Sequence, residues 1–151
     1  MTLTDSTDPR SVPESELQAI AALGMNYYQQ GRLKEAEAVF RFLLVLHPQA
    51  YYAHAGAGVV AMSQQPADLQ EACQCLSRAA ELNPSDASVR ASLGEVLLRM
   101  GEMEKAAEHL KRSVELDPYK KDSGAARAHA ILSGLWTITR QIEKKQKEAA
   151  A

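Results

Sequence analysis

Three prolines at nearly equal spacing divide most of the chain into units of similar length. Pro48, Pro84 and Pro118 each end a stretch in which apolar residues recur at helical spacing. A proline ring cannot continue the hydrogen-bond ladder of a helix, so each of them marks a helix end. When the three stretches are superposed, small and large apolar residues fall at the same offsets, which indicates an internal repeat. The repeats cover residues 17–50, 51–86 and 87–120, and the second carries two extra residues around Gln65 and Pro66.

Glycine and alanine occupy the offsets at which the two helices of one repeat must approach each other. These small residues are Gly24, Gly58 and Gly94 in the first helices, and Ala36, Ala72 and Ala106 in the second helices. Gly31 and Gly101 stand between the helices, where a left-handed turn favours glycine. The offsets resemble the tetratricopeptide repeat, a helix–turn–helix unit of 34 residues. This resemblance implies an all-α fold of three tandem repeats in a right-handed superhelix, closed by a C-terminal capping helix.

The composition agrees with a helical repeat. The chain has 151 residues, with 25 Ala and 17 Leu but only five Tyr, two Phe and one Trp. Alanine and leucine lead the helix-propensity ranking, whereas β-sheets favour β-branched and aromatic residues. We therefore expect a mobile arm over residues 1–13 and a repeat domain over 14–139, with its capping helix at 122–139. Residues 140–151 are expected to form a charged helical extension.

Charge and hydropathy exclude several classes of protein. The 17 Lys and Arg nearly balance the 19 Asp and Glu, so no general attraction for nucleic acid is expected. No apolar run approaches the length of a membrane span, which argues against membrane insertion. The polar start lacks the pattern of a secretory signal, so a cytoplasmic protein is predicted.

The sequence offers no constellation of catalytic residues. Its four histidines fall in different segments, and no phosphate-binding loop or nucleophile motif is present. Cys73 and Cys75 lie two residues apart on different helix faces, so we interpret both as packing residues. We therefore predict no catalytic residue, no metal site and no cofactor.

A binding surface is the remaining candidate for function. In tetratricopeptide arrays the first helix of each repeat lines a concave groove, at the second, fifth, ninth and twelfth positions of the unit. The predicted groove residues in this chain are Ala21, Met25, Tyr28, Tyr52, Ala55, Val59, Met62, Ala91, Glu95 and Leu98. Most of them are apolar, which indicates an extended apolar segment as the ligand.

The chain also resembles one particular group of repeat proteins, the class II (SycD/LcrH-like) translocator chaperones of type III secretion. The similarity is clearest in residues 27–33, 36–40 and 55–58, and in the length and charge of residues 135–147. The resemblance implies a non-enzymatic chaperone that holds an apolar segment of a translocator in its groove and keeps the translocator soluble before export. It also suggests a weak homodimer through the N-terminal arm and the first helix. Two alternatives remain open: a scaffold in another bacterial assembly, such as pilus biogenesis, and a co-chaperone of the needle subunit.

Overall fold

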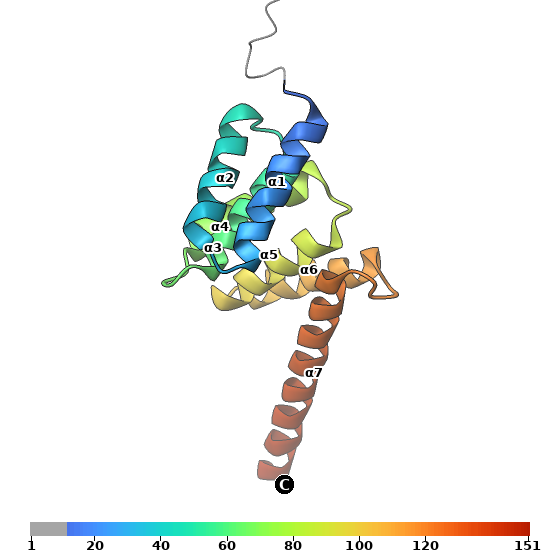
Figure 1. Ribbon diagram of the computed structural model, residues 1–151. Coiled ribbons are helices and arrows are strands. Elements are labelled where there is room, and N and C mark those ends of the chain that lie inside the picture. The colour runs from blue at the N-terminus through green and yellow to red at the C-terminus, as the bar shows by residue number, and fades with distance from the viewer. Residues whose placement is uncertain (1–11) are drawn as a thin grey trace, which may run out of the picture. The chain divides into compact units, whose positions relative to one another are not determined.

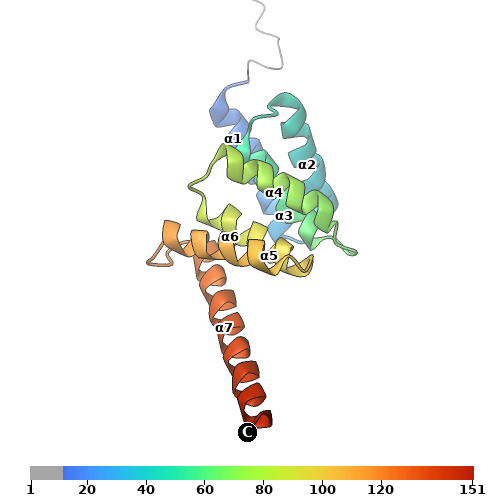
Figure 2. The same cartoon turned by 180° about the vertical axis from the view of Figure 1, so that it is seen from behind.

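The computed structural model describes residues 12–151, and these form seven α-helices and no strand (Figure 1, and from behind in Figure 2). The all-α prediction is therefore confirmed. The helices are α1 (Glu14–Gln29), α2 (Leu33–Leu46), α3 (Tyr51–Ser63), α4 (Leu69–Leu82), α5 (Ala87–Arg99), α6 (Met103–Leu116) and α7 (Ser123–Ala149). They divide into two compact units, an N-terminal unit that ends at Pro84 and a C-terminal unit that begins at Ser85. Among the described residues, none of the helices combines the length and the apolarity that crossing a bilayer requires.

The helix boundaries follow the residues that predicted them. α2, α4 and α6 each end two residues before a proline, at Pro48, Pro84 and Pro118. Gly31 and Gly101 have φ angles of 74° and 83°, a left-handed backbone conformation that residues other than glycine rarely adopt. The turn chemistry predicted from the sequence is confirmed.

The N-terminal unit is built around Phe40 of α2. This side chain is fully buried, and its ring lies against two glycines on different helices. A Cβ atom added at Gly24 of α1 would stand 2.9 Å from the ring's Cζ, and one added at Gly56 of α3 would overlap the ring. Because neither glycine carries a side chain, the Phe40 ring fits between α1 and α3 and packs the first repeat against the second. The rest of this core cluster is Leu17, Ala21, Ala36, Leu43, Ala50, Ala53 and Val60.

The C-terminal unit packs α5, α6 and α7 together. Its central cluster takes one fully buried residue from each helix, namely Ala91, Leu110 and Ala128. Gly94 allows α5 and α6 to approach, because a Cβ atom at this position would lie 2.6 Å from Leu110 Cγ. The close approach predicted from the repeat offsets is therefore present here as well.

The cap of α7 fixes the start of this helix to the rest of the C-terminal unit. The Asp122 carboxylate accepts hydrogen bonds from the backbone N–H groups of Gly124 (2.7 Å) and Ala125 (3.2 Å), and from the Ser88 hydroxyl of α5 (2.9 Å). An aspartate at this position satisfies N–H groups that have no partner within the helix. α7 is one continuous helix over the segments predicted as cap and extension. The predicted mobile arm lies outside the described residues, apart from Val12 and Pro13.

Candidate peptide-binding surface

The predicted groove residues lie on three helices. α1 carries Ala21, Met25 and Tyr28; α3 carries Tyr52, Ala55, Val59 and Met62; α5 carries Ala91, Glu95 and Leu98. Two of the ten side chains are buried, since Ala21 is 8% exposed and Ala91 is fully enclosed. We call the six half-buried residues of the N-terminal unit the α1–α3 surface: Met25, Tyr28, Tyr52, Ala55, Val59 and Met62.

A chain of hydroxyl groups ties α1 to α3 at one end of this surface. The Ser63 hydroxyl donates to the Val59 carbonyl at 2.9 Å, and the Tyr28 hydroxyl lies 3.2 Å from Ser63 Oγ. Because the single Ser63 proton is used on Val59, the Tyr28 hydroxyl acts as the donor to Ser63. The Tyr28 side chain of α1 is thereby tied to α3.

Tyr52 contributes a hydroxyl group of a different kind. Its oxygen is enclosed, and it lies close enough to the Glu14 carboxylate of α1 for that carboxylate to act on it as a hydrogen-bond acceptor. Burial, together with the nearby Glu14 carboxylate, raises the pKa of Tyr52 to about 12. The phenol therefore keeps its proton at neutral pH, and the Glu14 carboxylate is the acceptor that lies beside it.

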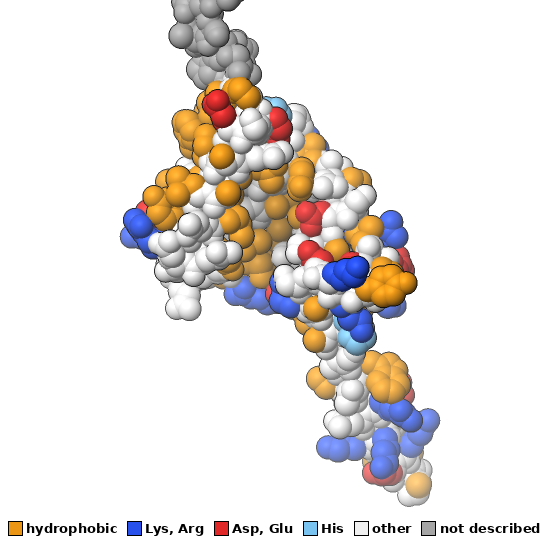
Figure 3. All heavy atoms as spheres, turned by 45° about the vertical axis from the view of Figure 1, so that its right-hand side comes forward, with side chains coloured by type: hydrophobic (Ala, Val, Ile, Leu, Met, Phe, Trp, Pro, Cys, Tyr) orange, Lys and Arg blue, Asp and Glu red, His pale blue; other side chains and the backbone are white. Residues whose placement is uncertain are grey.

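The surface of the N-terminal unit is rich in apolar side chains. Figure 3 shows hydrophobic side chains gathered on the face of this unit that is turned to the viewer. Methionine and tyrosine suit such a surface, because methionine adapts its shape and tyrosine combines an apolar ring with a polar tip. The α1–α3 surface therefore has the chemistry to hold apolar side chains of a ligand.

The three predicted groove residues of the C-terminal unit are engaged by α7. Ala91 and Leu98 pack with Ala128 of α7 in the central cluster. Glu95 accepts a 2.8 Å hydrogen bond from Arg127 Nε, an ion pair between α5 and α7. In this unit, α7 of the chain itself packs against the side chains at the repeat positions that predicted a groove.

A hollow that the sequence analysis missed opens on the N-terminal unit between α2, α3 and α4. It has a volume of about 400 Å³ and an apolar lining that includes Leu44, Val45 and Val60. Arg41 lies at its edge and pairs with Glu37 (2.7 Å) and with Glu71 (3.4 Å). The sequence signal that could have revealed this hollow is Val45, an apolar residue of α2 at an offset that the core does not use. In the structure its side chain is 79% exposed.

The titratable groups of the described residues offer little chemistry for catalysis. Burial, followed by the Glu71 charge, raises the pKa of Cys75, so its thiol stays protonated and is a poor nucleophile. His109 accepts a 3.1 Å hydrogen bond from Arg90 when its Nδ1 is unprotonated, and burial with this neighbouring charge lowers the His109 pKa. Within residues 12–151, no group of three or more His, Cys, Asp or Glu side chains is arranged to hold a metal ion.

Comparison with known proteins identifies the repeat family and a relative that is similar over almost the whole chain. The sequence profile of the tetratricopeptide repeat family matches residues 21–72 and 67–121, more than half of the chain. The chaperone protein SicA of Salmonella typhimurium is 29% identical over 144 residues, which cover 93% of this chain and 84% of SicA.

Two solved structures share the fold over most of its length. The Yersinia enterocolitica chaperone SycD, in complex with a peptide of the translocator YopD, superposes with a TM-score of 0.70 at 23% identity, over 84% of this chain and 97% of SycD. PcrH of Pseudomonas aeruginosa, in complex with the chaperone-binding region of PopB, gives a TM-score of 0.68 at 25% identity, over 80% of this chain and 98% of PcrH. These matches confirm the resemblance to the translocator chaperones of type III secretion.

Proposed function

Since the chain belongs to the tetratricopeptide repeat family, we propose that it is a chaperone that holds an extended apolar segment of a type III secretion translocator and keeps this client soluble before export. The observation that carries the proposal is the similarity to PcrH, which was solved with the chaperone-binding region of PopB on a chain that matches 80% of this one. The chaperone SicA adds a relative that matches almost the whole chain in sequence.

The α1–α3 surface is the proposed binding site for the client. It offers two tyrosines, two methionines and two small aliphatic residues, all half-buried and close to the core of the N-terminal unit. Three client side chains buried here would each contribute about 1.5–3 kcal/mol. Ordering a flexible segment costs about 2–5 kcal/mol, so additional backbone hydrogen bonds are needed for micromolar binding.

The proposed activity requires no bond making or breaking, so the protein acts by sequestration in the cytoplasm and without a cofactor. SicA is named a chaperone, and the raised pKa of Cys75 in this chain makes its thiol a poor nucleophile.

Peptide binding tests the proposal. The probe is a fluorescent peptide of the chaperone-binding region of PopB, with a second peptide from YopD, and the measurement is fluorescence anisotropy. We expect the wild-type chain to bind at least one peptide with micromolar affinity. Val59→Glu should weaken that binding about tenfold or more, because it places a carboxylate against apolar client groups.

Phe42→Glu is the control for this experiment. It also replaces an apolar side chain by glutamate in the same unit, at a residue of α2 that is 52% exposed and lies outside both the α1–α3 surface and the hollow between α2, α3 and α4. Its affinity should stay within about twofold of the wild type. Failure of the wild-type chain to bind either peptide would contradict the proposed function, and equal loss in both variants would contradict the proposed site.

A further inference from the structure

The second half of α7 extends beyond α5 and α6, and large apolar side chains lie on its surface (Figure 1 and Figure 2). Up to Leu132, the helix packs against the core of the C-terminal unit. Beyond it, Leu135 is half-buried, and Trp136, Ile138 and Ile142 are 63%, 56% and 51% exposed. The capping helix of a repeat array normally presents a polar outer face, so these four side chains need an explanation.

Helical periodicity places three of these side chains on one face of α7. Each residue advances the direction of its side chain by about 100° around the helix, so Leu135, Ile138 and Ile142 fall within a sector of about 60°. We call these three residues the α7 stripe. Trp136 lies about 130° from the middle of the stripe, at the border of the polar face. The second half of α7 is therefore amphipathic.

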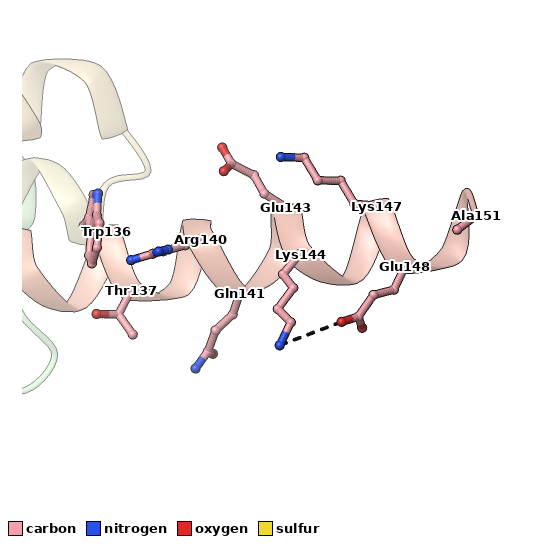
Figure 4. A pocket seen from close by; sticks show the side chains of 9 residues that line it. All are labelled: Trp136, Thr137, Arg140, Gln141, Glu143, Lys144, Lys147, Glu148 and Ala151. Carbon is pink, nitrogen blue, oxygen red and sulfur yellow. Dashed lines mark ion pairs between the residues drawn. The ribbon is translucent and has the colours of Figure 1, made fainter.

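Basic residues gather in the same part of the helix. Residues 140–151 hold four of the chain's 17 Lys and Arg, but only two of its 19 Asp and Glu. The other residues therefore carry 13 basic and 17 acidic side chains, so the end of α7 is positive on a chain that is otherwise negative. Figure 4 shows Arg140, Lys144 and Lys147 projecting from the helix, with Lys144 paired to Glu148 at 3.8 Å.

Lys145 is the charged residue nearest to the α7 stripe. It lies about 50° from the middle of the stripe, whereas Glu143 and Glu148 each lie about 110° away. A protein partner that covered the stripe would strip the hydration from the Lys145 ammonium group. At a membrane surface the aliphatic stem of the same lysine lies along the apolar layer, while its ammonium group stays among the lipid headgroups. The position of Lys145 therefore favours a lipid surface.

Trp136 and Arg140 add an aromatic and a cationic group at the border of the stripe. The Arg140 guanidinium group lies over the Trp136 ring, 5.0 Å from its centre, and Figure 4 shows the two side chains next to each other. Tryptophan is enriched at membrane–water interfaces, where its apolar ring and polar N–H both find suitable surroundings. An apolar face with tryptophan at its edge and Lys and Arg on the polar face is typical of helices that lie on membranes.

We propose that the second half of α7 binds the surface of an anionic phospholipid bilayer. The α7 stripe enters the apolar layer beneath the headgroups, and Trp136 lies at the interface. The basic residues of the segment, Arg140, Lys144, Lys145 and Lys147, lie among the lipid phosphates. The stripe is about 11 Å long, against about 30 Å for the bilayer core, so the helix lies on the membrane and does not cross it. No residue of the α1–α3 surface takes part, so lipid binding and client binding can fail separately.

Cosedimentation of the full chain with lipid vesicles tests the proposal. The probe is a vesicle of phosphatidylcholine with about 30% phosphatidylglycerol, and the comparison is a vesicle of phosphatidylcholine alone. We expect the anionic vesicle to bind the chain about fivefold or more tightly, and about 0.5 M NaCl to remove most of this preference, because salt screens the lipid charge. Absence of binding to the anionic vesicle, or equal binding to both vesicles, overturns the proposal.

The fluorescence of Trp136 gives a second readout, because this residue is the only tryptophan of the chain. Its side chain is 63% exposed, so its transfer to the membrane interface should shift the emission to shorter wavelength. Emission that stays unchanged at saturating anionic vesicles overturns the proposal. A shift that grows with protein concentration in the absence of lipid would assign the stripe to a second copy and would also overturn it.

Two double variants with the same change of charge separate the α7 stripe from the net charge of the chain. Ile138→Glu/Ile142→Glu should weaken binding to the anionic vesicle about tenfold or more, because carboxylates replace side chains that enter the apolar layer. The matched control is Met103→Glu/Tyr119→Glu, at side chains of the same unit that are 51% and 84% exposed and lie outside α7. Its binding should stay within about threefold of the wild type. Equal loss in the two variants, with unchanged helical circular dichroism, overturns the proposal.

Two further variants test the lipid charge and the place of binding. The triple variant Lys144→Gln/Lys145→Gln/Lys147→Gln keeps the stripe and should lose the preference for the anionic vesicle. Val59→Glu alters the proposed client site and should bind the anionic vesicle as the wild type does. A full preference in the triple variant, or loss of lipid binding in Val59→Glu, overturns the proposal, because the lipid would then be held elsewhere.

Discussion

The same repeat position has different surroundings in the two units. Ala55 of α3 and Ala91 of α5 occupy the fifth position of the second and third repeats. Ala55 is half-buried in the α1–α3 surface, whereas Ala91 is fully enclosed against Ala128 of α7. Near Ala91, Glu95 forms an ion pair with Arg127 of α7, whereas the α1–α3 surface of the N-terminal unit carries tyrosines and methionines.

This difference shows what a repeat alignment can specify. The offset within the repeat determines the direction in which a side chain points. The element that packs next determines whether that side chain is a site or a part of the core. In the C-terminal unit this element is α7, so a ligand could reach Ala91 only after α7 had moved away from the central cluster.

The largest effect is expected from one substitution made at both alanines. Ala91→Glu buries a carboxylate without a partner and should lower the free energy of unfolding by about 3–5 kcal/mol. Ala55→Glu should change stability by about 1 kcal/mol or less but should weaken peptide binding, because its carboxylate reaches the proposed surface. Urea unfolding followed by circular dichroism measures the first effect, and fluorescence anisotropy measures the second. Equal destabilisation by the two variants would remove the distinction between the units.

A smaller effect is expected from the polar links that join helices within each unit. Tyr28→Phe removes the hydrogen bond to Ser63 and should cost about 1 kcal/mol. Arg127→Ala removes a partly exposed ion pair with Glu95 and should cost only a few tenths of a kcal/mol, about the value of a surface salt bridge. The melting temperatures of the two variants, each compared with that of the wild type, measure both costs. A larger cost for Arg127→Ala would mean that the ion pair holds α7 more strongly than the packing does.

The last effect is expected in the dependence of stability on pH. The His109 pKa is lowered from 6.5, so its contribution to stability is present above pH 6.5 and is lost as the pH falls through the folded value. The Tyr52 pKa is raised from 10.0 to about 12, so its contribution is present below pH 10 and is lost as the pH rises to 12.

Thermal unfolding across pH checks this contrast between the units. Compared with the wild type, His109→Gln should lose less stability in acid, and Tyr52→Phe should lose less stability in alkali. Profiles that coincide with the wild type would show that neither group titrates differently in the folded chain.

Most of the fold could be predicted, because its determinants are local or repeat at fixed offsets. The prolines, the two glycines with positive φ and the glycines opposite Phe40 and Leu110 each have a role that a helix pair imposes on its own sequence. The contact of Gly56 with Phe40 was not predicted, because it joins α3 to the preceding repeat rather than to its own helix pair.

The candidate site was less accessible to prediction. The family resemblance identified the helices that carry it, and the repeat offsets named Tyr28 and Tyr52. The hydrogen bond of Tyr28 to Ser63 and the enclosure of the Tyr52 hydroxyl beside Glu14 depend on the distance between α1 and α3 and on burial. The enclosure of Ala91 depends on α7, which lies outside the repeated pattern.

The position of Phe40 between Gly24 and Gly56 has a consequence for how this sequence can vary. One ring sets the largest side chain that two other positions tolerate, and these positions lie in different repeats. The three residues therefore share one volume. A chain with a shorter residue at 40 would have room for a methyl group at 24 or 56, whereas a chain that keeps phenylalanine has no room for one at 56.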